Sequence, residues 1–125
     1  MNREELNMTD SLILSTETLK DGSIMIYTKA DDLRDESIAI HRKEYVDGFY
    51  IYTDDGYFLR EVYEQVDNAY LEKEVKKLAE AHNCQLNVVT RELTSVQAKD
   101  SIYNFSLIDL VQLIIRLEAK IKYDY

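Results

Sequence analysis

The sequence predicts an α+β domain, in which an antiparallel sheet from the N-terminal half packs against helices from the C-terminal half. In the first half, short runs of alternating apolar residues are separated by Asp-Gly pairs or acidic stretches, which is typical of antiparallel strands. In the second half, apolar residues recur at spacings of three and four, which is typical of amphipathic helices. The 125 residues include no proline. We therefore expect a single domain of continuous elements over 1–125.

The first strands are predicted by alternation and by a reversal signal. Residues 1–10 are either a short helix or a loose arm, and Ser11–Thr16 is either a first strand or the end of a helix. The Asp21-Gly22 pair is a strong turn signal. Ile24 and Ile26 then alternate with other residues over Ser23–Thr28, so a strand is expected there.

A charged connection precedes the next strand. Residues 30–36 carry four acids, and the Asp31-Asp32 pair could supply oxygen ligands for a divalent cation. The remainder of a calcium-binding loop pattern is missing, so we expect a solvated loop. Alternation resumes over Ser37–Arg42, where His41-Arg42-Lys43 makes a basic spot, and residues 45–48 reverse the chain.

The stretch Phe49–Thr53 is predicted as the central strand. Its odd-numbered residues and its two tyrosines, Tyr50 and Tyr52, fall on opposite faces, and neither set carries charge. We therefore expect an interior strand that is covered on both faces. The Asp54-Asp55-Gly56 turn ends this strand, because Asp bonds the local backbone and glycine tolerates positive φ.

Helices and short strands are predicted for the remainder of the chain. Tyr57–Val66 and Ala69–Ala81 have helical spacing, and His82-Asn83 is a stop signal because Asn tolerates the left-handed conformation. Residues 85–90 read as a strand, with a second strand ending near residue 98.

The closing helix is predicted over Leu107–Lys122. Ser106, with Asp109 three residues later, resembles a capping box. The apolar face of this helix is wider than a one-sided surface helix needs. Two interpretations remain: the helix is buried on the sheet, or part of the segment Leu107–Ile121 forms a homodimer interface.

The residues Thr53-Asp54-Asp55-Gly56-Tyr57, preceded by the Asp21-Gly22 turn, resemble the bacterial and phage family called domain of unknown function eighteen twenty-eight. Members of that family often open with a Thr-Pro pair, where this chain has Ser15-Thr16-Glu17. The resemblance implies a short antiparallel sheet, a Thr-Asp-Asp-Gly turn, helices, a small strand pair and a closing helix. It also implies a mobile-element setting, and it implies no chemistry.

Net charge and single residue types exclude several classes of function. The net charge of −9 disfavours direct nucleic-acid binding and suits a partner protein with a basic surface, although solubility alone also explains it. Cys84 is the only cysteine and two histidines are present, so we expect a buried thiol, no structural zinc site and no cofactor. No apolar run has the length of a membrane span or a signal peptide. A cytoplasmic protein without membrane contact is predicted.

The candidate site lies around the acidic turn. Asp54 and Asp55 could hold a metal ion at the end of a strand, with Glu61, Glu64 or Asp21 as further acids, but a turn whose carboxylates bond the backbone explains the same residues. The chain also has ten tyrosines, which suits either a binding surface or the edge of a core. The candidate binding residues are Tyr50, Tyr52, Asp54, Asp55, Tyr57 and Tyr63.

No catalytic or cofactor motif is recognisable. The leading hypothesis is a non-enzymatic, acidic protein-binding module of phage or mobile-element type that inhibits a host nucleic-acid-handling or defence protein, as anti-CRISPR or anti-restriction proteins do. The alternatives are a small metal-dependent phosphodiester hydrolase that uses Asp54 and Asp55, and a structural homodimer.

Overall fold

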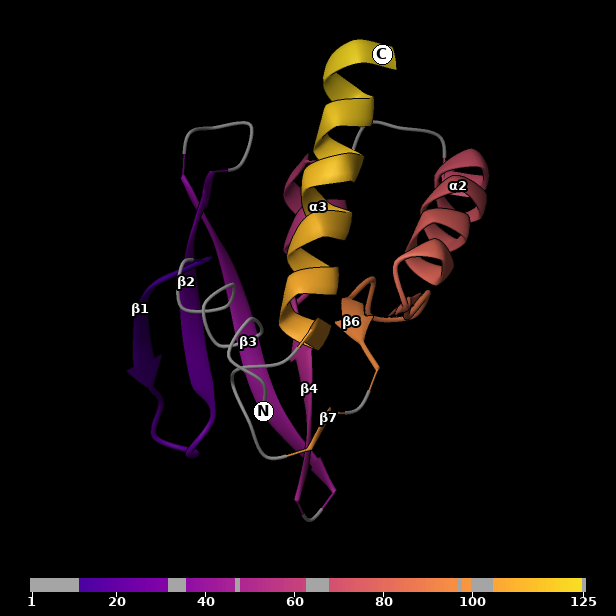
Figure 1. Cartoon of the computed structure of the whole chain (residues 1–125). Helices are drawn as coiled ribbons and strands as arrows, with labels where there is room; N and C mark the ends of the chain where they lie inside the picture. The colour runs from indigo at the N-terminus through magenta and orange to yellow at the C-terminus, as the bar shows by residue number, and fades with distance from the viewer. Residues whose placement is uncertain are drawn as a thin grey trace.

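The chain forms one antiparallel sheet of seven strands, with two α-helices packed on it (Figure 1). The computed structural model describes residues 12–31, 36–46, 48–62, 68–96, 98–99 and 105–124. The predicted arm at residues 1–10 and the acid pair's second member, Asp32, lie outside these residues. The predicted α+β fold, with its sheet from the N-terminal half and its helices from the C-terminal half, is confirmed.

The first four strands form an antiparallel meander. They are β1 (Ile13–Thr18), β2 (Ile24–Asp31), β3 (Ser37–Val46) and β4 (Phe49–Thr53), and each pairs with the next in antiparallel register. The ambiguous first segment is therefore a strand. The turn before β2 is closed by Asp21, whose carboxylate accepts a hydrogen bond from the backbone N–H of Ser23 at 2.9 Å.

Three short strands from the second half extend this sheet beyond β4. They are β5 (Cys84–Leu86), β6 (Leu93–Ser95) and β7 (Ala98–Lys99), and the strand order is β1-β2-β3-β4-β6-β5, with β7 also beside β4. β4 pairs with β6 at Thr53 and with β7 at Phe49 and Tyr50. Between these positions, the backbone N–H of Tyr52 donates to the Ser95 hydroxyl at 3.0 Å. The predicted interior position of β4 is confirmed. The expected cover on both faces is not found, because the described α-helices pack on one face of the sheet only, and a partner on the other face stays a prediction.

The predicted strand over residues 85–90 is wrong beyond Leu86. Asn87 begins a turn there, because its side-chain oxygen accepts the backbone N–H groups of Val89 at 3.0 Å and Thr90 at 3.1 Å. The backbone N–H of Arg91 donates to Asn87 O at 2.7 Å, which closes the loop between β5 and β6. Such Asn turns compete with the sheet ladder for backbone groups.

The helices agree with prediction except at two ends. Helix α2 spans Asn68–Ala81, and Asn83 has the predicted left-handed conformation, with φ of 58°. The predicted helix from Tyr57 is a π-helical segment, η1 (Phe58–Val62), and residues 63–66 of that prediction lie outside the described part. Helix α3 spans Phe105–Asp124, so Ser106 lies within the helix and the predicted cap is wrong: a capping residue precedes the first helical residue.

One core lies between the sheet and the two helices. It contains residues from β2, β3, β4, α2, β6 and α3, including Ile26, Ile40, Tyr52, Val75, Ala79, Leu93, Leu107, Leu110, Val111, Leu113, Ile114 and Leu117. Most of the predicted apolar stripe of α3 is thus covered within the chain, and Ile115 is 44% exposed. The homodimer remains a prediction. Among the described helices, none has the length and apolar character needed to cross a membrane.

Candidate functional site

The first carboxylate of the acidic turn, Asp54, is a structural group. Its side chain is 4% exposed. One oxygen accepts the backbone N–H groups of Gly56 at 2.8 Å and Leu93 at 3.0 Å, and the other accepts that of Phe58 at 3.1 Å. Burial raises the pKa of this carboxyl, while the three backbone hydrogen bonds oppose the increase. Asp54 therefore fastens the turn to β6 and to the start of η1.

The neighbouring carboxylate, Asp55, points instead to two basic side chains of β3, His41 and Lys43. Its oxygens lie 3.1 Å from His41 Nδ1 and 3.0 Å from Lys43 Nζ, and its side chain is 40% exposed. Asp55 has φ of 56°, a conformation that Asp adopts more readily than most residues. The two adjacent acids thus have different environments, one inside the fold and one at the surface.

Gly56 and Arg60 fix the far side of this turn. A Cβ atom at Gly56 would lie 3.1 Å from Arg60 Nε and 3.2 Å from Thr90 O, and Gly56 has φ of 78°. The Arg60 guanidinium donates to the carbonyl oxygens of Gly56, at 3.2 Å, and of Asp55. Glycine is therefore required at this position both by conformation and by space.

His41 joins the acidic turn to the turn between β1 and β2. Its Nδ1 faces Asp55, and its Nε2 lies 2.7 Å from the Ser23 hydroxyl oxygen. The Ser23 hydroxyl also lies 2.5 Å from an oxygen of Asp21. A chain of four polar side chains thus runs across one face of the sheet, from Asp55 through His41 and Ser23 to Asp21.

This chain lies on the face of the sheet opposite the core. Residues paired across strands share a face, and the pairs Met25 with His41 and His41 with Thr53 place these side chains together. We call this surface the open face, because no described α-helix packs on it. Strand pairing places on it Met25, Tyr27, Ala39, His41, Lys43, Ile51, Thr53 and Thr94, of which Thr53 is fully buried.

A hollow of about 420 Å³ lies on the open face. Its apolar lining is formed by Met25, Tyr27, Ala39 and Tyr57, and its polar lining comes from Glu36, Ser37, Asp54, Asp55 and Arg60. Ligand pockets in proteins are commonly apolar concavities of about 300–1,000 Å³ with a few placed polar groups. Asp55 and Tyr57, both predicted as binding residues, therefore lie at one hollow.

The other predicted tyrosines are placed differently. Tyr52 is fully buried, so its side chain belongs to the core and offers no surface to a partner. The Tyr50 ring lies under the Arg42 guanidinium, at 3.6 Å from its centroid, in a cation–π contact. Tyr63 lies outside the described residues. Of the six predicted site residues, the structure brings Asp54, Asp55 and Tyr57 together.

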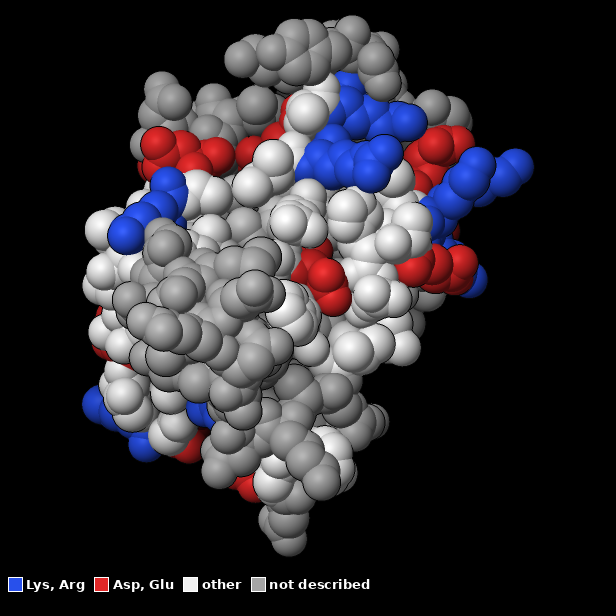
Figure 2. Space-filling model, viewed as in Figure 1, with Lys and Arg blue, Asp and Glu red and all other residues white. Residues whose placement is uncertain are grey.

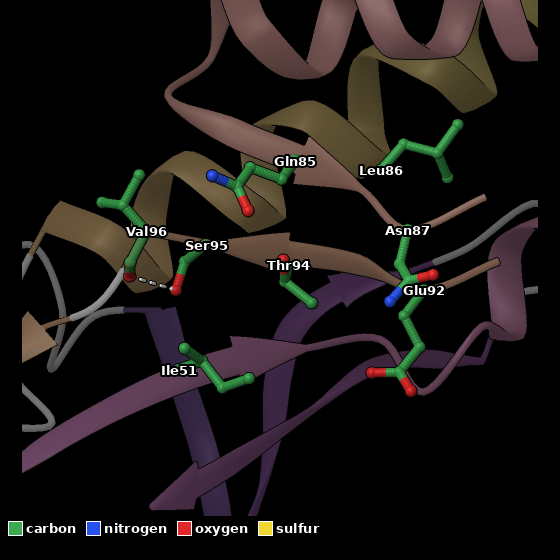
Figure 3. Close-up of a pocket in the computed structure, with 8 residues that line it drawn as sticks. All are labelled: Ile51, Gln85, Leu86, Asn87, Glu92, Thr94, Ser95 and Val96. Carbon is green, nitrogen blue, oxygen red and sulfur yellow. Dashed lines mark hydrogen bonds between the residues drawn. The ribbon is translucent and has the colours of Figure 1, made fainter. Parts of the chain in front are cut away.

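A larger cavity of about 750 Å³ opens where β6 diverges from β4 (Figure 3). Its lining is mostly polar and consists of Ile51, Gln85, Leu86, Asn87, Glu92, Thr94, Ser95 and Val96. The Ser95 hydroxyl donates to Val96 O at 2.8 Å, and Glu92 accepts the Thr53 hydroxyl at 2.7 Å. Sequence reasoning missed this cavity, because it depends on the divergence of two strands and not on any motif.

Cys84 is a buried structural residue, as predicted. It is 3% exposed, and burial raises the pKa of its thiol to about 12. The thiol donates to the carbonyl oxygen of His82 at 3.3 Å. Among the described residues, no group of three or more His, Cys, Asp and Glu side chains is arranged to hold a metal ion.

Comparisons of the chain with protein-family models, with curated proteins and with solved structures found no match. The resemblance to the domain of unknown function eighteen twenty-eight stays a prediction.

Proposed function

We propose that the chain is a protein-binding module that uses the open face of its sheet to bind a partner with a basic surface. The observation that carries this proposal is the hollow lined by Met25, Tyr27, Ala39 and Tyr57. Tyr and Met are enriched where proteins meet, because they offer large contact area and adapt to a partner. A side chain from a partner can enter this hollow without any rearrangement of the core.

The net charge of the chain supports the class of partner. At −9 it favours association with a basic protein and speeds the encounter. Proteins that handle nucleic acids carry such surfaces. Figure 2 shows basic and acidic side chains interspersed over the helical side of the molecule, which makes that side a poor candidate for a surface of one sign. The single cysteine fits a reducing compartment such as the cytoplasm.

The interpretation as a metal-dependent hydrolase has less support. Asp54 already accepts three backbone hydrogen bonds, and Asp55 is paired with His41 and Lys43. Metal-assisted hydrolysis needs carboxylates that converge on an ion and a bound water. Both carboxylates therefore have partners within the chain, and these partners account for the positions of Asp54 and Asp55 without a metal ion.

The binding proposal is tested by affinity capture from cell lysate with two matched variants. Ala39→Lys fills the hollow with a side chain whose positive charge repels a basic partner, whereas Val89→Ser changes an exposed residue, 87% accessible, in the loop between β5 and β6. We expect the wild type and Val89→Ser to capture the same nucleic-acid-handling protein, which heparin releases by competing for its basic surface. Ala39→Lys should lose that protein while remaining folded by circular dichroism. Equal capture by all three proteins would contradict the proposal.

A further inference from the structure

Three side chains from separate segments converge on the open face. In space they are linked as serine, histidine and aspartate, which is the arrangement found in serine hydrolases. Ser23 comes from the turn before β2, His41 from β3 and Asp55 from the turn after β4. The Ser23 oxygen lies 2.7 Å from His41 Nε2, and His41 Nδ1 lies 3.1 Å from Asp55. We propose that these residues form a nucleophilic serine site that hydrolyses small acyl esters, an activity separate from the binding function proposed above.

The role of each residue follows from the atoms that it presents. Nε2 of His41 faces the serine hydroxyl and acts as the general base, while Nδ1 donates to the Asp55 carboxylate, which positions the ring and stabilises it when protonated. The ring is firmly held, because the His41 side chain is only 11% exposed. This constellation is recognised by geometry and not by the order of residues along the chain.

A cavity of about 340 Å³ gives a substrate access to the serine. It is lined by Asp21, Gly22, Ser23, Arg42, Lys43, Glu44 and Tyr50. This volume is at the low end of ligand pockets, which restricts the substrate to a small acyl group. Lys43, which lies on the open face, supplies positive charge at this cavity, where negative charge develops on the acyl oxygen. Arg42 pairs with Tyr52 across the sheet, so its side chain lies on the core face.

Asp21 restrains this site. Its carboxylate accepts both the backbone N–H and the hydroxyl of Ser23, and the hydroxyl bond is the main cause of the lowered pKa of Asp21. The serine has one hydroxyl hydrogen, so rotation about its Cβ–Oγ bond must move that hydrogen from Asp21 toward His41 before attack. The negative charge of Asp21 also opposes the developing oxyanion.

The reaction is balanced with water as the only co-reactant. The hydroxyl proton passes to His41 Nε2 as the Ser23 oxygen bonds to the acyl carbon, and the same proton then leaves with the alcohol when the ester bond breaks. Water attacks the acyl-serine, again losing a proton to His41, and the proton returns to Ser23 as the carboxylic acid departs.

The test combines a fluorophosphonate probe with hydrolysis of p-nitrophenyl acetate by the full chain. The probe forms a bond between phosphorus and the Ser23 oxygen and releases fluoride, and mass spectrometry of the wild type identifies the modified residue without any variant. We expect modification of Ser23 alone, no labelling of Ser23→Ala, and labelling about 100-fold slower in His41→Gln. Asp21→Asn should be labelled about tenfold faster, because it removes the opposing charge.

Two further variants separate catalysis from structure. Ser15→Ala, which changes a serine on β1, should be labelled at the wild-type rate. Asp55→Asn keeps a residue that tolerates positive φ, and it should lower kcat for p-nitrophenyl acetate while leaving KM unchanged. The proposal is overturned if folded wild-type protein is not labelled, if the label is found on another residue, or if Ser23→Ala hydrolyses the ester as fast as the wild type.

Discussion

The two faces of the sheet are built from alternate residues of the same strands, but the side chains on the two faces differ in burial and in polar contacts. On the core face, Ile26, Ile40 and Tyr52 are fully buried beneath the helices. On the open face, their neighbours Met25 and His41 are only partly buried, and His41 is held by bonds to other polar side chains. The core face therefore obtains its stability from apolar burial, and the open face keeps polar groups within reach of ligands.

The same contrast separates the two adjacent acids of the turn. Asp54 is turned inward, and backbone N–H groups occupy its carboxylate. Asp55 is turned outward, and its carboxylate contacts the partly exposed side chains of His41 and Lys43. Residues next to each other in the sequence can therefore serve stability and surface chemistry separately, which makes matched substitutions informative.

The largest effect is expected for a tyrosine of the core face. Tyr52→Ala should lower the free energy of unfolding by about 3–5 kcal/mol, because it leaves a cavity in the packed core. Tyr57→Ala, at the hollow of the open face, should cost only about 1 kcal/mol. Chemical denaturation of both variants measures the difference. Equal losses would mean that the open face contributes to the core.

The next effect distinguishes the two acids. Asp54→Ala should cost about 3 kcal/mol, because it leaves buried backbone N–H groups without an acceptor. Asp55→Asn should cost less than about 1 kcal/mol, since it removes partly exposed ion pairs. Urea denaturation at neutral pH compares the two. A larger loss for Asp55→Asn would reverse the assignment of the inward and outward acids.

A smaller effect is expected from pH. Because burial raises the pKa of Asp54 in the folded state above its ordinary value of 3.8, the folded protein binds this proton more tightly than the unfolded chain does. The contribution of Asp54 to stability therefore falls as pH rises from 3.8 through the raised pKa. Denaturation over this interval should show the wild type losing stability relative to Asp54→Asn. The opposite slope would mean that the hydrogen bonds outweigh burial.

The smallest effect is expected at the loop between β5 and β6. Val89→Ser should change the free energy of unfolding by less than about 0.5 kcal/mol, because the side chain is 87% exposed. Thermal unfolding monitored by circular dichroism provides the measurement. A clear loss of stability would show that this loop packs against the rest of the chain.

Local signals predicted most of the fold. Alternation with Asp-Gly or acidic connections predicted β2 to β4, and helical spacing predicted α2 and α3, whereas the segment of β1 was left open between a strand and the end of a helix. The short strands were harder to predict, because β5 and β6 are each three residues long and offer little periodicity. Val88 and Val89 continue the apolar pattern past Leu86, but Asn87 captures the backbone and ends the strand. The hydrogen bonds from the nearby backbone to the Asn87 side chain therefore end the strand, although the apolar pattern continues.

The site was predicted only in part. The turn motif placed Asp54, Asp55 and Tyr57 near one another, and the structure adds that the two acids point in different directions. The contact between His41 and Ser23 depends on the register of β2 against β3. The acidic connection between these strands does not fix that register, so the sequence showed His41 only as part of a basic spot.

Because Cys84 is buried, alkylation of its thiol can be used to measure unfolding of the protein. A thiol that is 3% exposed and has a pKa raised to about 12 does not react with alkylating reagents at neutral pH while the fold is intact. The chain has no other cysteine, so each molecule can be labelled at one place only, and only after it opens. The rate of alkylation therefore measures how often the junction between α2 and β5 opens in solution.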